Sequence, residues 1–156
     1  MATAHGAGLP KTRTAGNHPP ATSASVRRRM QNTPTRDTPA ELALRSALHA
    51  AGLRYRVDTA PIVGVRRRAD LVFRRARVAV FVDGCFWHAC PEHGGVPKVN
   101  AAWWSAKLSR TRERDADTDR LLNEHGWLSV RVWEHEPVGA AAERVKATVR
   151  SRLADP

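Results

Sequence analysis

The sequence predicts one α/β or α+β domain, in which a single mixed β-sheet is flanked by helices. Three observations predict this class. The chain has 156 residues, which suffices for one hydrophobic core. Helical and strand patterns follow one another in the order α-β-β-β-α-β-α, without an internal repeat. The chain has no run of about 18 apolar residues, so no membrane span is expected.

The N-terminal part of the chain is predicted to lie outside this core. Residues 1–25 are rich in Ala, Gly, Pro, Thr and Ser and have few large apolar side chains, which predicts a disordered tail. Residues 26–37 are predicted to form an irregular basic arm that can fold on a partner. The ordered domain, with this arm included, is therefore predicted to span residues 26–156.

The first regular element is a helix predicted from Thr38 to Gly52. Thr38 is a good N-cap, Pro39 suits the first helical position, and Glu41 completes a capping box. An apolar stripe follows at helical spacing, made of Leu44, Ala47, Leu48 and Ala51. Gly52 is expected to end the helix, and the alternating segment 53–57 then predicts a half-buried strand.

The remaining elements follow from apolar runs and helix boundaries. They are strands at 69–73, 77–83 and 127–136, a long amphipathic helix at 100–126, and a closing helix opened by Pro137. The strand at 77–83 is almost continuously apolar, which predicts a central place in the sheet. Asn100 is expected to cap the long helix and Gly126 to end it.

The charge of the chain is strongly positive and unevenly distributed. The formal net charge is +11, and no acidic residue precedes Asp37. The basic residues before it are Lys11, Arg13, Arg27, Arg28, Arg29 and Arg36. A basic arm on a basic domain suits phosphate binding through counterion release. A solvated tail is the alternative, and composition does not distinguish nucleic acid from another polyanion.

Two acidic residues lie on neighbouring predicted strands. Asp70 falls at the start of the strand 69–73, and Asp83 ends the strand 77–83. If these strands form a hairpin, the two carboxylates meet at one end of the sheet, where they would suit Mg²⁺. Such an ion can activate water and stabilise charge on a scissile phosphate. The alternative is a strand-capping role for Asp70 and a simple turn at Asp83-Gly84.

Metal-type ligands follow directly after the second of these strands. Cys85, Cys90 and His93 offer three ligands within nine residues, which favours zinc over free thiols. A structural zinc site needs a fourth ligand. His135 is the best candidate, because its strand is expected to lie beside 77–83; His88 and His125 are alternatives.

Aromatic residues surround the same segment. Phe86 and Trp87 follow the end of the strand, and Trp103-Trp104 lies a short way along the chain. Apolar wedges of this kind can enter a base stack. Core packing is the alternative, although the basic arm and the candidate magnesium site favour DNA.

The segment FVDGCFWHACPEH (81–93) resembles the core motif of the very short patch repair endonucleases. These enzymes nick DNA at T:G mismatches and are related to the restriction-endonuclease fold. Four further blocks resemble the same family in the same order: residues 35–57, 69–73, 103–127 and 130–136. The resemblance therefore covers the chain from about Ser25 to Glu136 and implies a restriction-endonuclease-like domain with a structural zinc site.

The resemblance implies a role for each matching residue. Asp70 matches the aspartate that binds catalytic Mg²⁺, with the Val82 carbonyl as a further ligand, and His88 matches the catalytic histidine. Glu41 and Asp115 match acids around a second hydrated metal. The residues that match the four structural zinc positions are Cys85, Cys90, His93 and His135. The residues that match DNA contacts are the wedge of Phe86, Trp87 and Trp104, and Met30 in the arginine-rich arm.

Three departures from the family pattern bear on these roles. Asp83 stands where some relatives have a histidine, so its role is less defined than that of Asp70. Thr111 replaces an asparagine of some relatives near the second metal. His93 is shifted by one position along the chain, and His135 stands where some members have cysteine.

The implied activity is Mg²⁺-dependent nicking of one strand 5′ to the thymine of a T:G mismatch, which arises from deamination of 5-methylcytosine. The expected partners are mismatched double-stranded DNA and, after the nick, a repair polymerase and ligase. The protein is expected to be a monomer. Without an apolar secretory segment at the N-terminus, it is expected in the cytoplasm, associated with the nucleoid. Two other classes stay open: a non-catalytic, zinc-stabilised DNA-binding protein, and a restriction-like nuclease without mismatch specificity.

Overall fold

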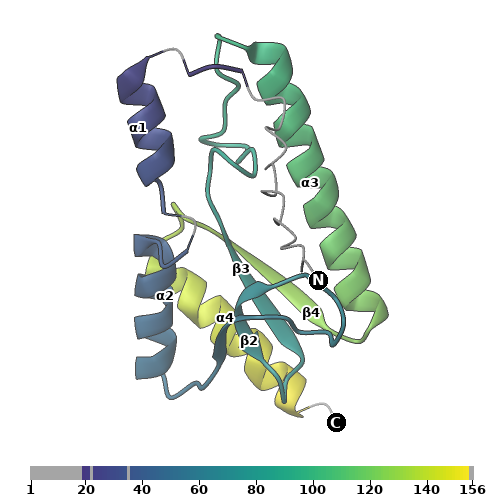
Figure 1. Ribbon diagram of the computed structural model, residues 1–156. Coiled ribbons are helices and arrows are strands. Elements are labelled where there is room, and N and C mark those ends of the chain that lie inside the picture. Colours follow the sequence, from purple (N-terminus) through teal and green to yellow (C-terminus); the bar gives the residue numbers. More distant parts are fainter. Residues whose placement is uncertain (1–18, 22, 35, 155–156) are drawn as a thin grey trace, which may run out of the picture.

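The computed structural model describes residues 19–21, 23–34 and 36–154, and it confirms a mixed α/β architecture (Figure 1). Its elements in chain order are α1 (Ala24–Asn32), α2 (Pro39–Ala50), β1 (Arg56–Thr59), β2 (Ala69–Phe73), β3 (Val78–Asp83), α3 (Ala101–Glu124), β4 (Leu128–Trp133) and α4 (Val138–Ala154). From α2 onward, this order is the one that the sequence predicts.

The four strands form one sheet in the order β1-β2-β3-β4. β1, β2 and β3 are antiparallel neighbours, whereas β3 and β4 run parallel. A parallel pair needs a crossover connection, and the long helix α3 supplies it. Because Asp83 pairs with Trp133 in this register, the chain leaves β3 and β4 at the same end of the sheet.

Helices cover both faces of the sheet. Val78 and Val80 of β3 pack with buried residues of α2 and α4, whereas Ala79 lies in a second cluster with Leu122 of α3. Successive side chains of a strand point to opposite faces, so β3 contributes to both clusters. Figure 1 shows α2 and α4 together beside the strands and α3 apart from them. The predicted central position of this strand is therefore confirmed.

The prediction of an irregular arm at 26–37 is wrong, because α1 occupies much of it. The Ser23 side chain accepts a hydrogen bond from the Val26 N–H and caps the helix. Arginine is a good helix former, and no Gly or Pro interrupts the helix before Pro34. Of the predicted tail, residues 1–18 and 22 lie outside the described residues.

One strand boundary and one helix cap also differ from expectation. β1 begins at Arg56, later than predicted, because the Leu53 N–H donates to the Leu48 carbonyl and closes the end of α2 instead. Asn100 precedes α3 as predicted, but its side chain makes no capping hydrogen bond. Its backbone is left-handed, with φ at 58°, a conformation that asparagine tolerates better than most residues.

Candidate functional site

The predicted acids meet where β2 begins and β3 ends. The two strands form the expected hairpin, which brings Asp70 and Asp83 to the same end of the sheet. The Val82 N–H donates to Asp70 Oδ2 at 2.7 Å and holds that carboxylate against β3. Both acids and His88 line a cavity of about 380 Å³.

Arginines make up much of the remaining cavity wall, namely Arg66, Arg67, Arg68, Arg114 and Arg131. Arg67 pairs with Asp117 at 3.0 Å and Arg68 with Asp58 at 2.7 Å. Arg66 and Arg114 make no ion pair within the part of the chain that the structure describes. The cavity therefore places acids among cationic side chains, which suits a phosphate group held near a metal cation.

The half-buried carboxylate of Asp70 is poorly stabilised by the protein alone. Burial raises the pKa of Asp70 to about 6; the hydrogen bond from Val82 opposes this shift, and the charges of Glu41 and Asp83 add to it. Asp70 Oδ1 accepts no hydrogen bond from the described residues. A bound cation would favour the ionised form of this side chain.

These donors fit Mg²⁺. In proteins this ion is usually held by one or two carboxylates, with waters and substrate phosphates completing its shell. Asp70 supplies the carboxylate, Val82 lies beside it on β3, and the cavity leaves room for water and a phosphate.

His88 lies beyond β3 and faces two acids. Its Nδ1 is 2.6 Å from Asp115 Oδ2 on α3 and 3.6 Å from Asp83 Oδ1. Burial lowers the pKa of His88, but the hydrogen bond to Asp115 and the charges of Asp83 and Asp115 outweigh it and raise the pKa. With Nδ1 engaged, Nε2 is the ring atom left for proton transfer.

Asp83 is paired with an arginine of the neighbouring strand. It is 4% exposed, and both of its carboxylate oxygens lie 3.0 Å from Arg131 Nη1. Arg131 also donates to Asp119 and to the backbone carbonyl of Asp115 on α3. One guanidinium thus connects β3, β4 and α3 beside His88.

Glu41 lines the cavity but has local partners. Its carboxylate accepts hydrogen bonds from the Asp37 N–H at 3.0 Å and from Arg45 Nη2 at 3.1 Å. Thr38 Oγ1 in turn accepts from the Glu41 N–H. The capping role predicted for Thr38 and Glu41 is present, although the Glu41 side chain reaches the N–H one residue before the N-cap.

The four predicted zinc ligands are brought together at the same sheet end. One ligand atom from each of Cys85, Cys90, His93 and His135 lies within 4.8 Å of all the others. The Cys85 Sγ–His135 Nδ1 distance is 3.1 Å, and the Cys90 Sγ–His93 Nδ1 distance is 4.0 Å. The alternatives are engaged elsewhere: His88 with Asp115, and His125 Nδ1 with the Leu121 carbonyl.

This donor set fits a structural zinc ion. Two thiolates and two imidazoles form a usual tetrahedral set, and zinc–ligand bonds of about 2.0–2.3 Å place such ligands a few ångströms apart. The turn is tightly packed, since a Cβ on Gly94 would lie 2.3 Å from the Cys90 carbonyl oxygen. Only glycine fits at that position without a shift of the backbone.

The predicted wedge residues form one aromatic cluster. The Phe86 ring lies 5.0 Å from that of Trp87 and 5.2 Å from that of Trp104, measured between centroids. Lys107 Nζ lies 4.9–5.3 Å from the ring centroids of Trp87, Trp103 and Trp104. Burial lowers the pKa of Lys107. Thr111 donates to the Lys107 carbonyl one helical turn away.

The arginine-rich helix α1 faces this cluster across a cavity. Arg27 and Gln31 of α1 line a space of about 470 Å³ together with Trp87 and Lys107. Arg28 and Arg29 are exposed on the same helix. Met30 lies in α1, and its side chain is outside the described part of the structure.

Sequence reasoning missed two polar side chains that shape the site. These are Arg131 and Asp119, which pair with one another beside Asp83 and His88. The signal for Arg131 was present, since it is the one charged residue in the strand LSVRVW. Asp119 lies among several charged residues of α3 and had no such signal.

Comparison with known proteins identifies the family. The model of the family described as DNA mismatch endonuclease Vsr matches residues 20–92. The type II nicking enzyme V.NaeI of Lentzea aerocolonigenes is 44% identical over 136 residues, which cover 86% of this chain and 82% of the relative. The DNA mismatch endonuclease Vsr of Escherichia coli (strain K12) is 36% identical over 115 residues, covering 71% and 70%. The type II nicking enzyme V.NmeDIP of Neisseria meningitidis serogroup C is 37% identical over 128 residues, covering 79% and 84%.

An arginine-lined cavity with acids and a histidine, and relatives of this kind, define a DNA-acting endonuclease. The chain belongs to the DNA mismatch endonuclease Vsr family. The resemblance seen in the sequence is thereby confirmed. Among the described residues, no helix is both long and apolar enough to cross a membrane.

Proposed function

We propose that the protein is a Mg²⁺-dependent endonuclease that nicks one DNA strand 5′ to the thymine of a T:G mismatch. The observation that carries this proposal is the convergence of Asp70 and the His88–Asp115 pair on one arginine-lined cavity. The placement of a hairpin and a parallel strand around these residues supports a restriction-endonuclease-like fold. Family membership supports the substrate class.

Asp70 and the Val82 carbonyl would hold the catalytic Mg²⁺. When bound, this ion polarises the scissile phosphate and lowers the pKa of coordinated water. Asp70 is suited to this task because its half-buried carboxylate has a raised pKa and would gain from a cation.

His88 is the proton-transfer group. Asp115 fixes its Nδ1, so Nε2 can accept a proton from the attacking water. The water oxygen forms a bond to phosphorus as the bond to the 3′ oxygen breaks. The products are a 3′-hydroxyl, protonated from solvent, and a 5′-phosphate. Arg66 and Arg114 would bind phosphate oxygens at the cavity rim.

Recognition of the mismatch would come from the aromatic cluster. Phe86, Trp87 and Trp104 would enter the base stack, and a T:G wobble pair resists such unstacking less than a matched pair. The helix α1, with Met30 and three arginines, would bind the other side of the duplex. A zinc ion held by the Cys/His group would fix the loop that carries Phe86, Trp87 and His88.

A nicking assay tests this function. Wild-type protein and an Asp70→Asn variant are incubated with a T:G duplex and a matched C:G duplex, with and without Mg²⁺, in a library of flanking sequences. We expect only the wild type to nick, only with Mg²⁺, and only at T:G. Equal nicking of both duplexes would indicate a nuclease without mismatch specificity. Binding without nicking would indicate a non-catalytic DNA-binding protein.

A further inference from the structure

Arg131 is the most fully engaged cation in the described part of the chain. It lies on β4, beside Phe81 of β3 in the parallel register, and its guanidinium carbon is 4.8 Å from the centroid of the Phe81 ring. Its nitrogens reach three acidic residues. Nε lies 3.0 Å from Asp119 Oδ2, Nη1 lies 3.0 Å from both Asp83 oxygens, and Nη2 lies 3.2 Å from the Asp115 carbonyl oxygen.

This geometry excludes phosphate binding as the main role of Arg131. A guanidinium has five N–H donors on three nitrogens. All three nitrogens of Arg131 are engaged, and Nη2 makes a second bond, to Asp119 Oδ1 at 3.1 Å. The group lines the cavity, yet its donors point into the protein. Arg66 and Arg114 of the same cavity, by contrast, have no ion pair among the described residues.

The same geometry makes Asp83 a poor ligand for a cation. A carboxylate whose two oxygens face one guanidinium has its charge compensated, and a divalent ion on it would lie next to Arg131. Asp70 differs in both respects, because the described residues give it one N–H donor and no cation at hydrogen-bonding distance.

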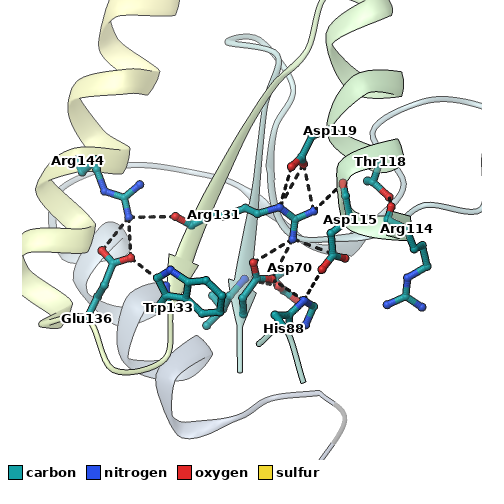
Figure 2. Close-up of polar contacts among 12 residues, drawn as sticks. Asp70, His88, Arg114, Asp115, Thr118, Asp119, Arg131, Trp133, Glu136 and Arg144 are labelled. Carbon is teal, nitrogen blue, oxygen red and sulfur yellow. Dashed lines mark hydrogen bonds and ion pairs between the residues drawn. The ribbon is translucent and has the colours of Figure 1, made fainter. Parts of the chain in front are cut away.

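The contacts of Arg131 lead to His88 by two routes. Asp83, held by Nη1, lies 3.6 Å from His88 Nδ1. Asp115, whose carbonyl is held by Nη2, lies 2.6 Å from the same nitrogen through its carboxylate. Figure 2 shows Arg131 between Asp119 on one side and the group of Asp115 and His88 on the other.

We propose that Arg131 is a positioning residue that clamps Asp83 and Asp115 so that His88 is aimed at the scissile phosphate, and that Asp83 belongs to this clamp and does not bind Mg²⁺. This inference rests on the proposed function. Loss of Arg131 would leave Asp83 buried and uncompensated beside His88, where it competes with Asp115 for Nδ1. The rate of cleavage would then fall while DNA affinity stays the same.

The test compares Arg131→Met, Arg131→Lys, Asp83→Asn and the double variant Asp83→Asn/Arg131→Met with wild type. Single-turnover nicking of a T:G duplex gives the rate, and fluorescence anisotropy gives the DNA affinity. The matched control is Lys146→Met, which breaks the ion pair with Glu143 on α4, outside the cavity. Bound zinc and melting temperature confirm that each variant is folded.

We expect Arg131→Met to lower the rate about 100-fold, with DNA affinity within about threefold of wild type. Arg131→Lys should recover part of the loss. The double variant should be faster than Arg131→Met, because it no longer has an uncompensated Asp83. If Arg131→Met does not fold, the rates of Arg131→Lys and the double variant decide in the same way.

Three results would overturn the inference. One is an Arg131→Met rate equal to wild type. Another is weakened DNA binding at an unchanged rate, which would make Arg131 a phosphate ligand. The third is an Asp83→Asn variant that needs far more Mg²⁺ than wild type for its half-maximal rate, together with a double variant that nicks no faster than Arg131→Met. If wild type nicks no duplex, the proposed function fails. The inference is then tested by the ¹⁵N chemical shifts of the His88 ring in zinc-loaded wild type and zinc-loaded Arg131→Met. Identical shifts in the two proteins would overturn it.

Discussion

The two groups of metal-type ligands at the end of β3 are built in opposite ways. The Cys/His group is assembled within the protein, with four ligand atoms within 4.8 Å of one another. In the neighbouring cavity, three of the acids each pair with a side chain of the protein: Asp83 with Arg131, Asp115 with His88, and Glu41 with Arg45.

This difference separates a structural from a catalytic use of the same sheet end. A closed ligand set fixes the chain and leaves no position for substrate, whereas a catalytic site keeps positions open. Among the described residues, Asp70 Oδ1 accepts no hydrogen bond, so the proposed site would be complete only with a cation and a phosphate present. Each prediction below perturbs one side of this comparison.

Removal of zinc should have the largest effect. Chelation of a zinc-loaded preparation, or the substitution Cys90→Ser, is expected to lower the melting temperature by about 10 °C or more and to abolish nicking, because the metal stabilises the loop that carries His88. Calorimetry and metal analysis measure this. The control is His125→Ala, which lies outside the ligand group. A Cys90→Ser protein with normal zinc content and stability would contradict the assignment.

Asp70→Asn should abolish activity and yet stabilise the metal-free protein. Burial raises the pKa of Asp70 to about 6, so the ionised side chain costs folding free energy above that pH. The variant should gain roughly 1–3 kcal/mol in free energy of unfolding at pH 7. This gain should shrink as the pH falls below 6 and vanish below the unfolded value near 3.8.

Denaturant unfolding across pH, with and without Mg²⁺, measures this effect. Mg²⁺ should raise the stability of wild type but have little effect on Asp70→Asn, because that variant lacks the charged ligand of the proposed site. A variant that is less stable than wild type at pH 7, or that responds equally to Mg²⁺, would show that Asp70 is not the metal ligand.

Asp115→Asn should lower the nicking rate by about 100-fold. The Asp115 carboxylate is a main reason for the raised pKa of His88, so its loss should move the pH dependence of the rate to lower pH. In wild type, the His88–Asp115 contact contributes fully to the free energy of unfolding at pH values below the pKa of histidine in the unfolded chain. This contribution is lost as the pH rises through the pKa of His88 in the folded protein. Glu113→Gln, exposed on the same helix and outside the cavity lining, serves as the control. An unshifted pH profile would contradict the His88–Asp115 pairing.

Glu41→Gln should have the smallest catalytic effect, about a tenfold loss, because Glu41 lies at the cavity beside Asp70 but is engaged in the cap of α2. Thr38→Ala removes the same cap from outside the cavity and should cost about 1 kcal/mol of stability with normal nicking. If the two variants have equal nicking rates, Glu41 has only the capping role.

Much of this comparison follows from the sequence because it depends on strand order. Asp70 and Asp83 meet because a hairpin joins their strands, and His135 reaches Cys85 because β4 is parallel to β3. Both arrangements follow from apolar runs and short connections. The helix α1 was not predicted, because this short arginine-rich segment has little apolar surface to pack on a core and its N-cap, Ser23, falls within the predicted tail.

The partners of Arg131 were also not predictable from local pattern. Asp115 and Asp119 lie on a helix whose charged residues are spread around its surface, and the side facing β4 depends on how α3 crosses the sheet. Such a crossing angle is set by side-chain packing and not by hydropathy alone.

The parallel register of β3 and β4 ties the Cys/His group to the part of the chain that follows α3. Cys85 and His135 are separated along the chain by the whole of α3 and β4, and the pairing of β4 with β3 brings their side chains together. Closing so long a loop early would be entropically unfavourable. Tight metal uptake therefore reports a finished chain, and a protein truncated before β4 should hold zinc only weakly.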